Sequence, residues 1–210
     1  MFNFKFLHAA LVAGLLAFSG AAQAVTTTYT NGNLLTGYTG APTAPNFATL
    51  AVTDLRNGIW SFTLAINNTL FSTFGDNAFI GSMSFDFAPD PVNNLKTTFL
   101  SSNVGGVTSV GLTNGTGTGG GFSDVDFGTK FGQGSRNRLS QNDYVTWTVS
   151  GLTGSNYAAS YLHLQGGPNR GSAKYSAVSA IPEPETYAMM LAGLGLMGYT
   201  ARRRKTNNVS

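Results

Sequence analysis

The chain contains no cysteine, which excludes disulfide bonds and thiol chemistry. A domain of ordinary size can still fold on its apolar core alone. Histidine and glutamate are almost as scarce: the histidines are His8 and His163, and the glutamates are Glu183 and Glu185. Residues 25–179 therefore hold no glutamate, while threonine, serine, asparagine and glycine are frequent, and this composition disfavours helices.

Charge is also scarce between residues 25 and 179. The basic residues of this segment are Arg56, Lys96, Lys130, Arg136, Arg138, Arg170 and Lys174. The acidic residues are Asp54, Asp76, Asp86, Asp90, Asp124, Asp126 and Asp143. The two sets are equal in number, so the segment is formally neutral. It has no electrostatic reason to bind nucleic acid, which is therefore not expected as a partner.

Residues 1–24 have the pattern of a secretory signal peptide. Lys5 supplies a positive charge, an apolar run follows, and Ala22 and Ala24 form the small-x-small cleavage pattern. The mature chain is expected to begin at Val25. A buried N-terminal helix is the alternative, but charge, apolar run and cleavage site come in the order of a signal peptide.

A second membrane-directed segment lies near the C-terminus. The triplet Pro182, Glu183 and Pro184 is rigid and extended, and an apolar run follows it. We expect a short transmembrane helix at 186–200, since the apolar run has no polar face and so does not fit an amphipathic helix packed on the domain. The cations that would stop it on the cytoplasmic side are Arg202, Arg203, Arg204 and Lys205.

This order of triplet, apolar run and cations resembles the PEP-CTERM sorting tail of exported bacterial proteins. The resemblance implies recognition and cleavage near the triplet by exosortase, a membrane cysteine protease, after export through the Sec translocon and signal peptidase. It also implies a Gram-negative bacterium that makes exopolysaccharide. We therefore expect four segments: a signal peptide at 1–24, a domain at 25–179, the sorting segment at 180–205 and a tail at 206–210.

Alternating apolar and polar residues predict strands in the domain. The alternation covers 60–66, 83–87, 145–149 and 161–165, and further strands are expected at 47–55 and 173–178. The glycine-rich stretch 110–121 predicts a flexible loop, and 176–181 predicts a linker to the sorting segment. We expect an all-β fold, an antiparallel β-sandwich of jelly-roll type with eight to ten short strands. Each strand would have one buried apolar face and one face exposed to solvent.

Aspartate is the only acidic residue available for chemistry in this domain. Asp124 and Asp126 would project from one face of a strand and could share Ca²⁺. Their spacing implies no further oxygen ligand, which favours a solvated strand face, while Asp86 and Asp90 beside a proline turn favour turn formation. An aspartate pair could also serve a glycan hydrolase, which needs two carboxyl groups about 5 Å or ~6.5–9.5 Å apart.

No other residues form a catalytic pattern. His163 lies alone on the polar face of its predicted strand, without a nucleophile motif beside it. No G-x-S-x-G, H-E-x-x-H or P-loop sequence occurs. No catalytic, metal-binding or cofactor-binding residues, and no cofactor, are therefore predicted.

Aromatic residues offer a different surface chemistry. The tyrosines that could stack on carbohydrate are Tyr29, Tyr38, Tyr144, Tyr157, Tyr161 and Tyr175. Trp60 and Trp147 fall on apolar strand faces and are expected in the core. Segments 74–79 and 122–127 also look like the FxDxF group of PEP-CTERM proteins, although their second phenylalanine comes one residue late.

These patterns together predict a non-enzymatic exported protein. It would be tethered transiently to the inner membrane and then reside in the cell envelope, at the cell surface or in the extracellular matrix of a biofilm. Polysaccharide or other surface proteins are its expected partners. The alternatives are a surface glycan hydrolase that uses an aspartate pair and a Ca²⁺-dependent adhesin.

Overall fold

A computed structural model describes residues 24–43, 46–90, 94–105, 107–114, 125–132, 134, 138–181, 193–194 and 197. The predicted signal peptide, apart from residue 24, lies outside the described residues. So do the Pro-Glu-Pro triplet, most of the predicted transmembrane helix and the basic stop. Within the described part, no helix is long and apolar enough to cross a membrane.

Ten strands account for most of the described domain. They are β1 (Val25–Gly37), β2 (Ala48–Asp54), β3 (Ile59–Ile66), β4 (Phe79–Ala88), β5 (Lys96–Ser102), β6 (Gly111–Asn114), β7 (Phe127–Lys130), β8 (Tyr144–Ser150), β9 (Asn156–Gln165) and β10 (Ala173–Ile181). Two short helices, α2 (Thr69–Phe74) and η1 (Pro168–Arg170), lie between strands. All neighbouring strands pair antiparallel, which confirms the expected all-β antiparallel class.

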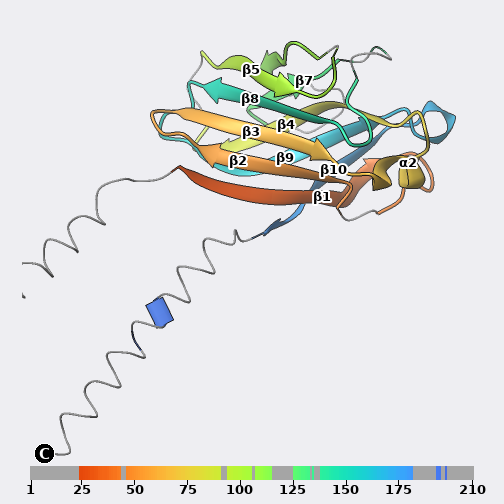
Figure 1. Cartoon of the computed structure of the whole chain (residues 1–210), viewed down its shortest axis with the longest axis horizontal. Coiled ribbons are helices and arrows are strands. Elements are labelled where there is room, and N and C mark those ends of the chain that lie inside the picture. The colour runs from red at the N-terminus through yellow and green to blue at the C-terminus, as the bar shows by residue number, and fades with distance from the viewer. Residues whose placement is uncertain are drawn as a thin grey trace, which may run out of the picture.

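The strands form one continuous sheet in the order β5-β8-β3-β2-β1-β10-β9-β4-β7-β6. The sheet curls over so that its two halves face each other (Figure 1). Its edge strands approach closely: the Thr97 hydroxyl of β5 donates to the carbonyl of Val110, next to β6, at 2.9 Å. The structure therefore differs from the expected sandwich of two separate sheets. The reason is that β1 pairs with both β2 and β10 and joins the halves into a nearly closed barrel.

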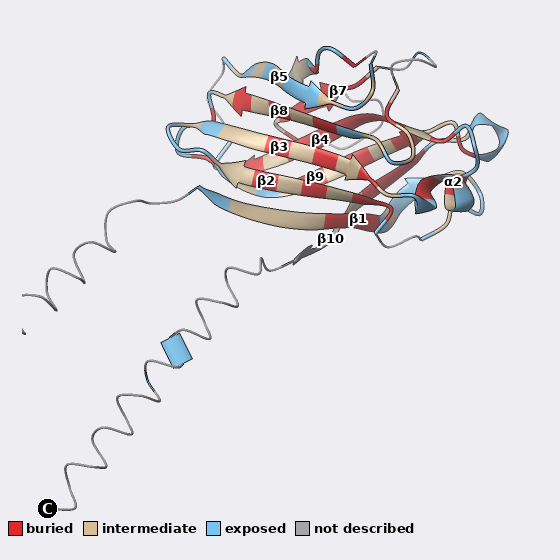
Figure 2. Cartoon of the chain, in the orientation of Figure 1, coloured by how far each residue is buried: buried red, intermediate tan, exposed pale blue. Residues whose placement is uncertain are grey.

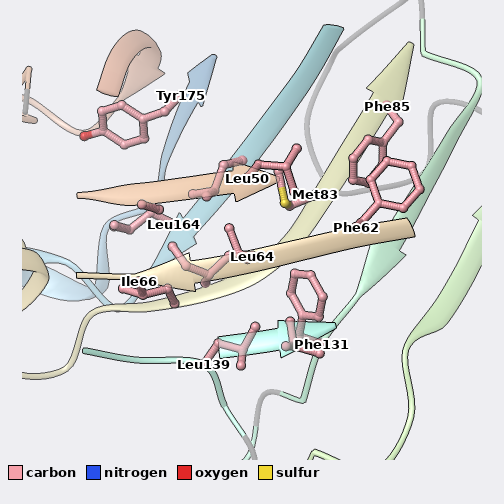
Figure 3. Close-up of a cluster of buried hydrophobic side chains, with 14 of the residues drawn as sticks. Leu50, Phe62, Leu64, Ile66, Met83, Phe85, Phe131, Leu139, Leu164 and Tyr175 are labelled. Atoms are coloured by element: carbon pink, nitrogen blue, oxygen red, sulfur yellow. The ribbon is translucent and has the colours of Figure 1, made fainter. Parts of the chain in front are cut away.

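The apolar core lies between the two halves. Phe62, Leu64 and Ile66 of β3 are all buried, as their alternation predicts, and Figure 3 shows them pointing toward side chains from the other half. The ring centroids of Phe62 and Phe85 of β4 lie 4.8 Å apart, and Trp147 of β8 stacks on Phe62 at 5.5 Å. Such aromatic pairs add about 0.5–1.5 kcal/mol each beyond the area that they bury.

Burial departs from simple alternation on β4. Ser82 and Ser84 lie on the face opposite Met83 and Phe85, yet both serines are buried (Figure 2). On the neighbouring strand β9, the positions paired with these serines carry larger residues, His163 opposite Ser82 and Tyr161 opposite Ser84. The expected solvent-exposed face is therefore absent on this strand, because larger neighbours cover small polar residues.

Two local expectations were wrong, and one helix was not expected. Part of the predicted loop 110–121 forms β6, which pairs with β7 from Gly111↔Lys130 to Asn114↔Phe127. The predicted linker 176–181 continues β10, because it pairs with β1 as far as Ile181. The helix α2 was not predicted; the Asn67 side chain accepts a hydrogen bond from the Thr69 N–H at 2.9 Å and caps it.

Both ends of the described domain lie at the same end of the sheet. Val25, the first residue of β1, pairs with Asp54 of β2, and Ile181, the last residue of β10, pairs with Thr28 of β1. The helix α2 lies at the opposite end (Figure 1). A ten-residue strand such as β9 spans roughly 30 Å between these ends. The domain boundaries at 25 and 179 remain predictions.

Candidate functional site

A cleft of about 530 Å³ opens at the end of the sheet that carries α2. It is lined by residues 74–77, Phe79, Arg138 and residues 166–170, and we call it the Arg cleft. Its walls are the turn between α2 and β4 and the η1 turn after β9. Its volume lies within the range of about 300–1,000 Å³ that is common for small-molecule sites.

Two guanidinium groups and one carboxylate line this cleft, from Arg138, Arg170 and Asp76. The Arg138 guanidinium carbon lies 5.3 Å from the ring centroid of Phe79, a cation–π contact that positions it over the ring. The backbone beside it is also held, since the Ile80 N–H donates to the Leu139 carbonyl at 2.8 Å. The Arg cleft thus carries an excess of positive charge.

The η1 wall of the Arg cleft is tightly constrained. The Gly167 N–H donates to the Gly171 carbonyl at 3.0 Å, which closes the turn. Asn169 and Arg170 both have left-handed backbone conformations, with φ of 55° and 59°. Non-glycine residues in such conformations cost about 1–3 kcal/mol each and persist only where the surroundings hold them. The wall is therefore preorganised.

Gly166 lies where this wall meets the rest of the cleft, so a substitution at Gly166 tests how rigid the wall is. The φ of Gly166 is +73°, and a Cβ there would lie 2.1 Å from the backbone carbonyl oxygen of Asn77. We expect Gly166→Ala to lower the free energy of unfolding by roughly 2–4 kcal/mol, from backbone strain plus the clash. The matched control is Gly40→Ala, with φ +79° and no atom within 4 Å, which should cost about 1 kcal/mol. Chemical denaturation of both variants would measure the difference; equal losses would contradict the close approach.

A second, smaller cavity of about 240 Å³ lies at the opposite end of the sheet. We call it the aromatic pocket. Its lining includes three aromatic and three polar residues: Tyr29, Trp60, Tyr157, Thr27, Asp54 and Asn156. It lies beside both domain ends, because Val25 also lines it and Ile181 pairs with the neighbouring Thr28.

The rings of the aromatic pocket pack against one another. Tyr29 and Tyr157 have ring centroids 4.7 Å apart, and Phe87 contacts both Tyr157 and Trp60 edge-on. The Tyr157 hydroxyl donates to Ser160 Oγ at 2.7 Å, while burial raises the pKa of Tyr157 above its ordinary value. Trp60, expected in the core, is thus only half-buried and lines a surface pocket.

Of the two aspartates expected to share Ca²⁺, the structure describes one. Asp124 lies outside the described residues. Asp126 accepts a hydrogen bond from the Phe87 N–H at 2.6 Å and so ties the segment before β7 to β4. Asp86 is half-buried within β4, and Asp90 is exposed after it. Of the described aspartates in this set, none lines either cavity.

His163 occupies the outer face of β9, between Lys174 of β10 and Ser82 of β4 in the strand register. Burial, and then the positive charge of Lys174, lowers the pKa of His163. The imidazole is therefore neutral at pH 7. Among the described residues, no group of three histidine, cysteine, aspartate or glutamate residues is placed to hold a metal ion.

The tyrosines expected on the surface separate into different environments. Tyr175 is fully buried, and its hydroxyl donates to the Pro42 carbonyl at 2.9 Å, so it belongs to the core. Tyr144 is exposed, while Tyr29 and Tyr157 meet in the aromatic pocket. Sequence reasoning singled out segment 74–79 for its likeness to the FxDxF group, but it placed neither Arg138 nor Arg170 at a site. The available signals were that segment and the cluster of turn residues after β9.

Comparison with known proteins identifies the segment that follows the domain. Residues 180–205 match the model of the PEP-CTERM protein-sorting motif, beginning with the last two residues of β10. No curated protein and no solved structure matches the chain. The match covers the Pro-Glu-Pro triplet, the apolar run and the cations. This chain therefore carries a PEP-CTERM protein-sorting motif, the signal of proteins that exosortase processes and that are exported to the cell envelope or surface.

Proposed function

We propose that this protein is a non-enzymatic component of the bacterial cell surface or extracellular matrix that binds polysaccharide. The observation that carries the proposal is the PEP-CTERM motif at residues 180–205, which begins with the last two residues of the final strand of a β-domain. The signal peptide at 1–24 directs the chain through the Sec translocon. The helix at 186–200 tethers it to the inner membrane until exosortase cleaves near Pro182, Glu183 and Pro184.

The chemistry of the two cavities supports a binding role. Among the described residues, the Arg cleft is lined by one carboxylate, Asp76, and the aromatic pocket by one, Asp54. Asp54 is engaged by the following turn, where it accepts the Arg56 N–H at 2.7 Å. A glycan hydrolase needs two carboxyl groups on either side of its bond. The cavities instead combine aromatic, amide and guanidinium groups, which bind sugars without cleaving them.

The test of this proposal is the fate of the chain in cells. In a Gram-negative host that carries exosortase, we expect a shortened form in the envelope or medium, and in a host without exosortase, an intact tail in the inner membrane. Fractionation with mass measurement distinguishes the two. Identical mass and location of the protein in both hosts would contradict cleavage of its tail by exosortase. Release of sugars from exopolysaccharide by the purified protein would overturn the non-enzymatic role.

Signal cleavage gives a separate prediction. Signal peptidase accepts only a small side chain before the cleaved bond, so Ala24→Phe should abolish cleavage between residues 24 and 25. The variant should retain its signal peptide and remain in the inner membrane. N-terminal mass spectrometry is the measurement, with Ala24→Gly as the matched control that should still be cleaved. A mature N-terminus at Val25 in the phenylalanine variant would show that the site is misassigned.

A further inference from the structure

We propose that the Arg cleft binds a carboxylated sugar unit of an acidic polysaccharide. This inference rests on the proposed matrix function and names the class of glycan. It starts from the charges of the cleft. Arg138 and Arg170 both line the cleft. Among the described residues, neither guanidinium group has a carboxylate within 4 Å, since the ion pair formed by these residues is Arg56–Asp54, outside the cleft. Two guanidinium groups are thus available to an anion.

Guanidinium groups select carboxylates by geometry. Their planar fork donates two parallel hydrogen bonds to one carboxylate, which a single ammonium cannot do. The contact with Phe79 restricts the orientation of the Arg138 group, and the closed η1 turn holds the backbone of Arg170. The Arg138 head group and the Arg170 backbone are therefore ordered before an anion binds, which favours affinity.

The other polar groups of the cleft match hydroxyls. The Asp76 carboxylate accepts hydrogen bonds, and the Asn77 and Asn169 amides both donate and accept them. An inorganic anion such as phosphate is repelled by the charge of Asp76 and has fewer hydroxyl groups than a sugar to donate to it. A sugar acid presents both a carboxylate for the guanidinium groups and hydroxyls for the aspartate and amides. The cleft therefore fits a uronate better than a free anion.

The position of the cleft favours a polymer over a free sugar. The sorting motif begins at the last residues of β10, and Ile181 lies at the end of the sheet where β1 starts. The Arg cleft lies at the other end, after β9, roughly 30 Å along the strands. While the chain is tethered, this end faces away from the attachment point, toward the surrounding matrix.

The experiment measures binding of defined oligosaccharides to the purified full chain in a neutral detergent, at physiological salt. The probes are hexagalacturonate, its methyl-esterified form and inorganic phosphate, studied by calorimetry. We expect the hexamer to bind and the ester, which keeps the sugar and removes the charge, to bind at least about tenfold more weakly. Equal binding of the ester, no binding of the hexamer, or phosphate that binds as tightly as the hexamer would overturn the proposal.

Variants connect the binding to the cleft. Arg138→Gln and Arg170→Gln should each weaken hexamer binding on the order of tenfold. Lys96→Gln is the matched control, because it removes the same charge from the exposed start of β5, outside the cleft, and should change nothing. Arg170 is exposed on a surface turn, so we expect Arg170→Gln to fold. If Arg138→Gln does not fold, the binding measured for Arg170→Gln decides whether the cleft is the site. Equal losses in Lys96→Gln and Arg170→Gln would show general charge attraction and overturn the site. Export and tail cleavage are measured separately in cells, so a failure of sugar binding and a failure of processing can be distinguished.

Discussion

Replacement of Pro182, Glu183 and Pro184 by three alanines should abolish tail processing. The apolar run and the cations after it are unaltered, so insertion into the inner membrane should persist, because it depends on apolar burial and on positive charge retained in the cytoplasm. The recognised rigid, acidic triplet is lost, so exosortase should no longer cleave. We expect the full-length tail to accumulate in the inner membrane of a host that carries exosortase, as measured by fractionation and intact mass.

A companion variant separates recognition from anchoring. Deletion of residues 202–205 keeps the triplet and removes the charges that hold the helix end in the cytoplasm. Some molecules should then fail to stop in the membrane, and the distribution between membrane and soluble fractions should change. A triple-alanine variant that is shortened and released like the wild type would show that the triplet is not the sorting signal.

The largest effect on stability is expected from truncation in the aromatic core. Phe85 is fully buried, and its ring centroid lies 4.8 Å from that of Phe62, 5.1 Å from Phe127 and 6.2 Å from Trp147. Phe85→Ala removes these contacts at the point where the two halves of the sheet meet. We expect the free energy of unfolding to fall by about 3–5 kcal/mol, measured by chemical denaturation.

The matched control for this variant is Leu100→Ala. Leu100 lies on edge strand β5 with 52% of its surface exposed, so its truncation leaves no cavity and should change stability by less than about 0.5 kcal/mol. Similar losses for Phe85→Ala and Leu100→Ala would mean that the halves of the sheet do not pack as the structure places them. A loss confined to Phe85→Ala supports the nearly closed barrel.

Local patterns predicted the strands that pack on the core. Alternation at 60–66 and 145–149 corresponds to β3 and β8, because an apolar face must be buried wherever a strand covers the core. Weakly patterned segments were missed. Gly111–Asn114 has little intrinsic strand preference and becomes β6 through pairing with β7. Likewise, the length of β10 follows from its pairing with β1.

The cavities could not be predicted in the same way. The Arg cleft combines residues 74–77, Phe79, Arg138 and residues 166–170, which come from three separate parts of the chain and share no spacing. Trp60 continues the alternation of β3, yet it is half-buried, because it lies where the sheet ends and the aromatic pocket opens. Their chemistry therefore depends on how the sheet curls.

The sequence by itself determined the sorting motif and the all-β class. A sorting motif is read as a contiguous segment, and strand periodicity is a property of neighbouring residues, so both are local. Only the tertiary structure decided that a single sheet curls into a nearly closed barrel, and that Arg138 and Arg170 line one cleft at the end away from Ile181. These features depend on long-range strand pairing, which joins β1 to β10 and β3 to β8 across most of the chain.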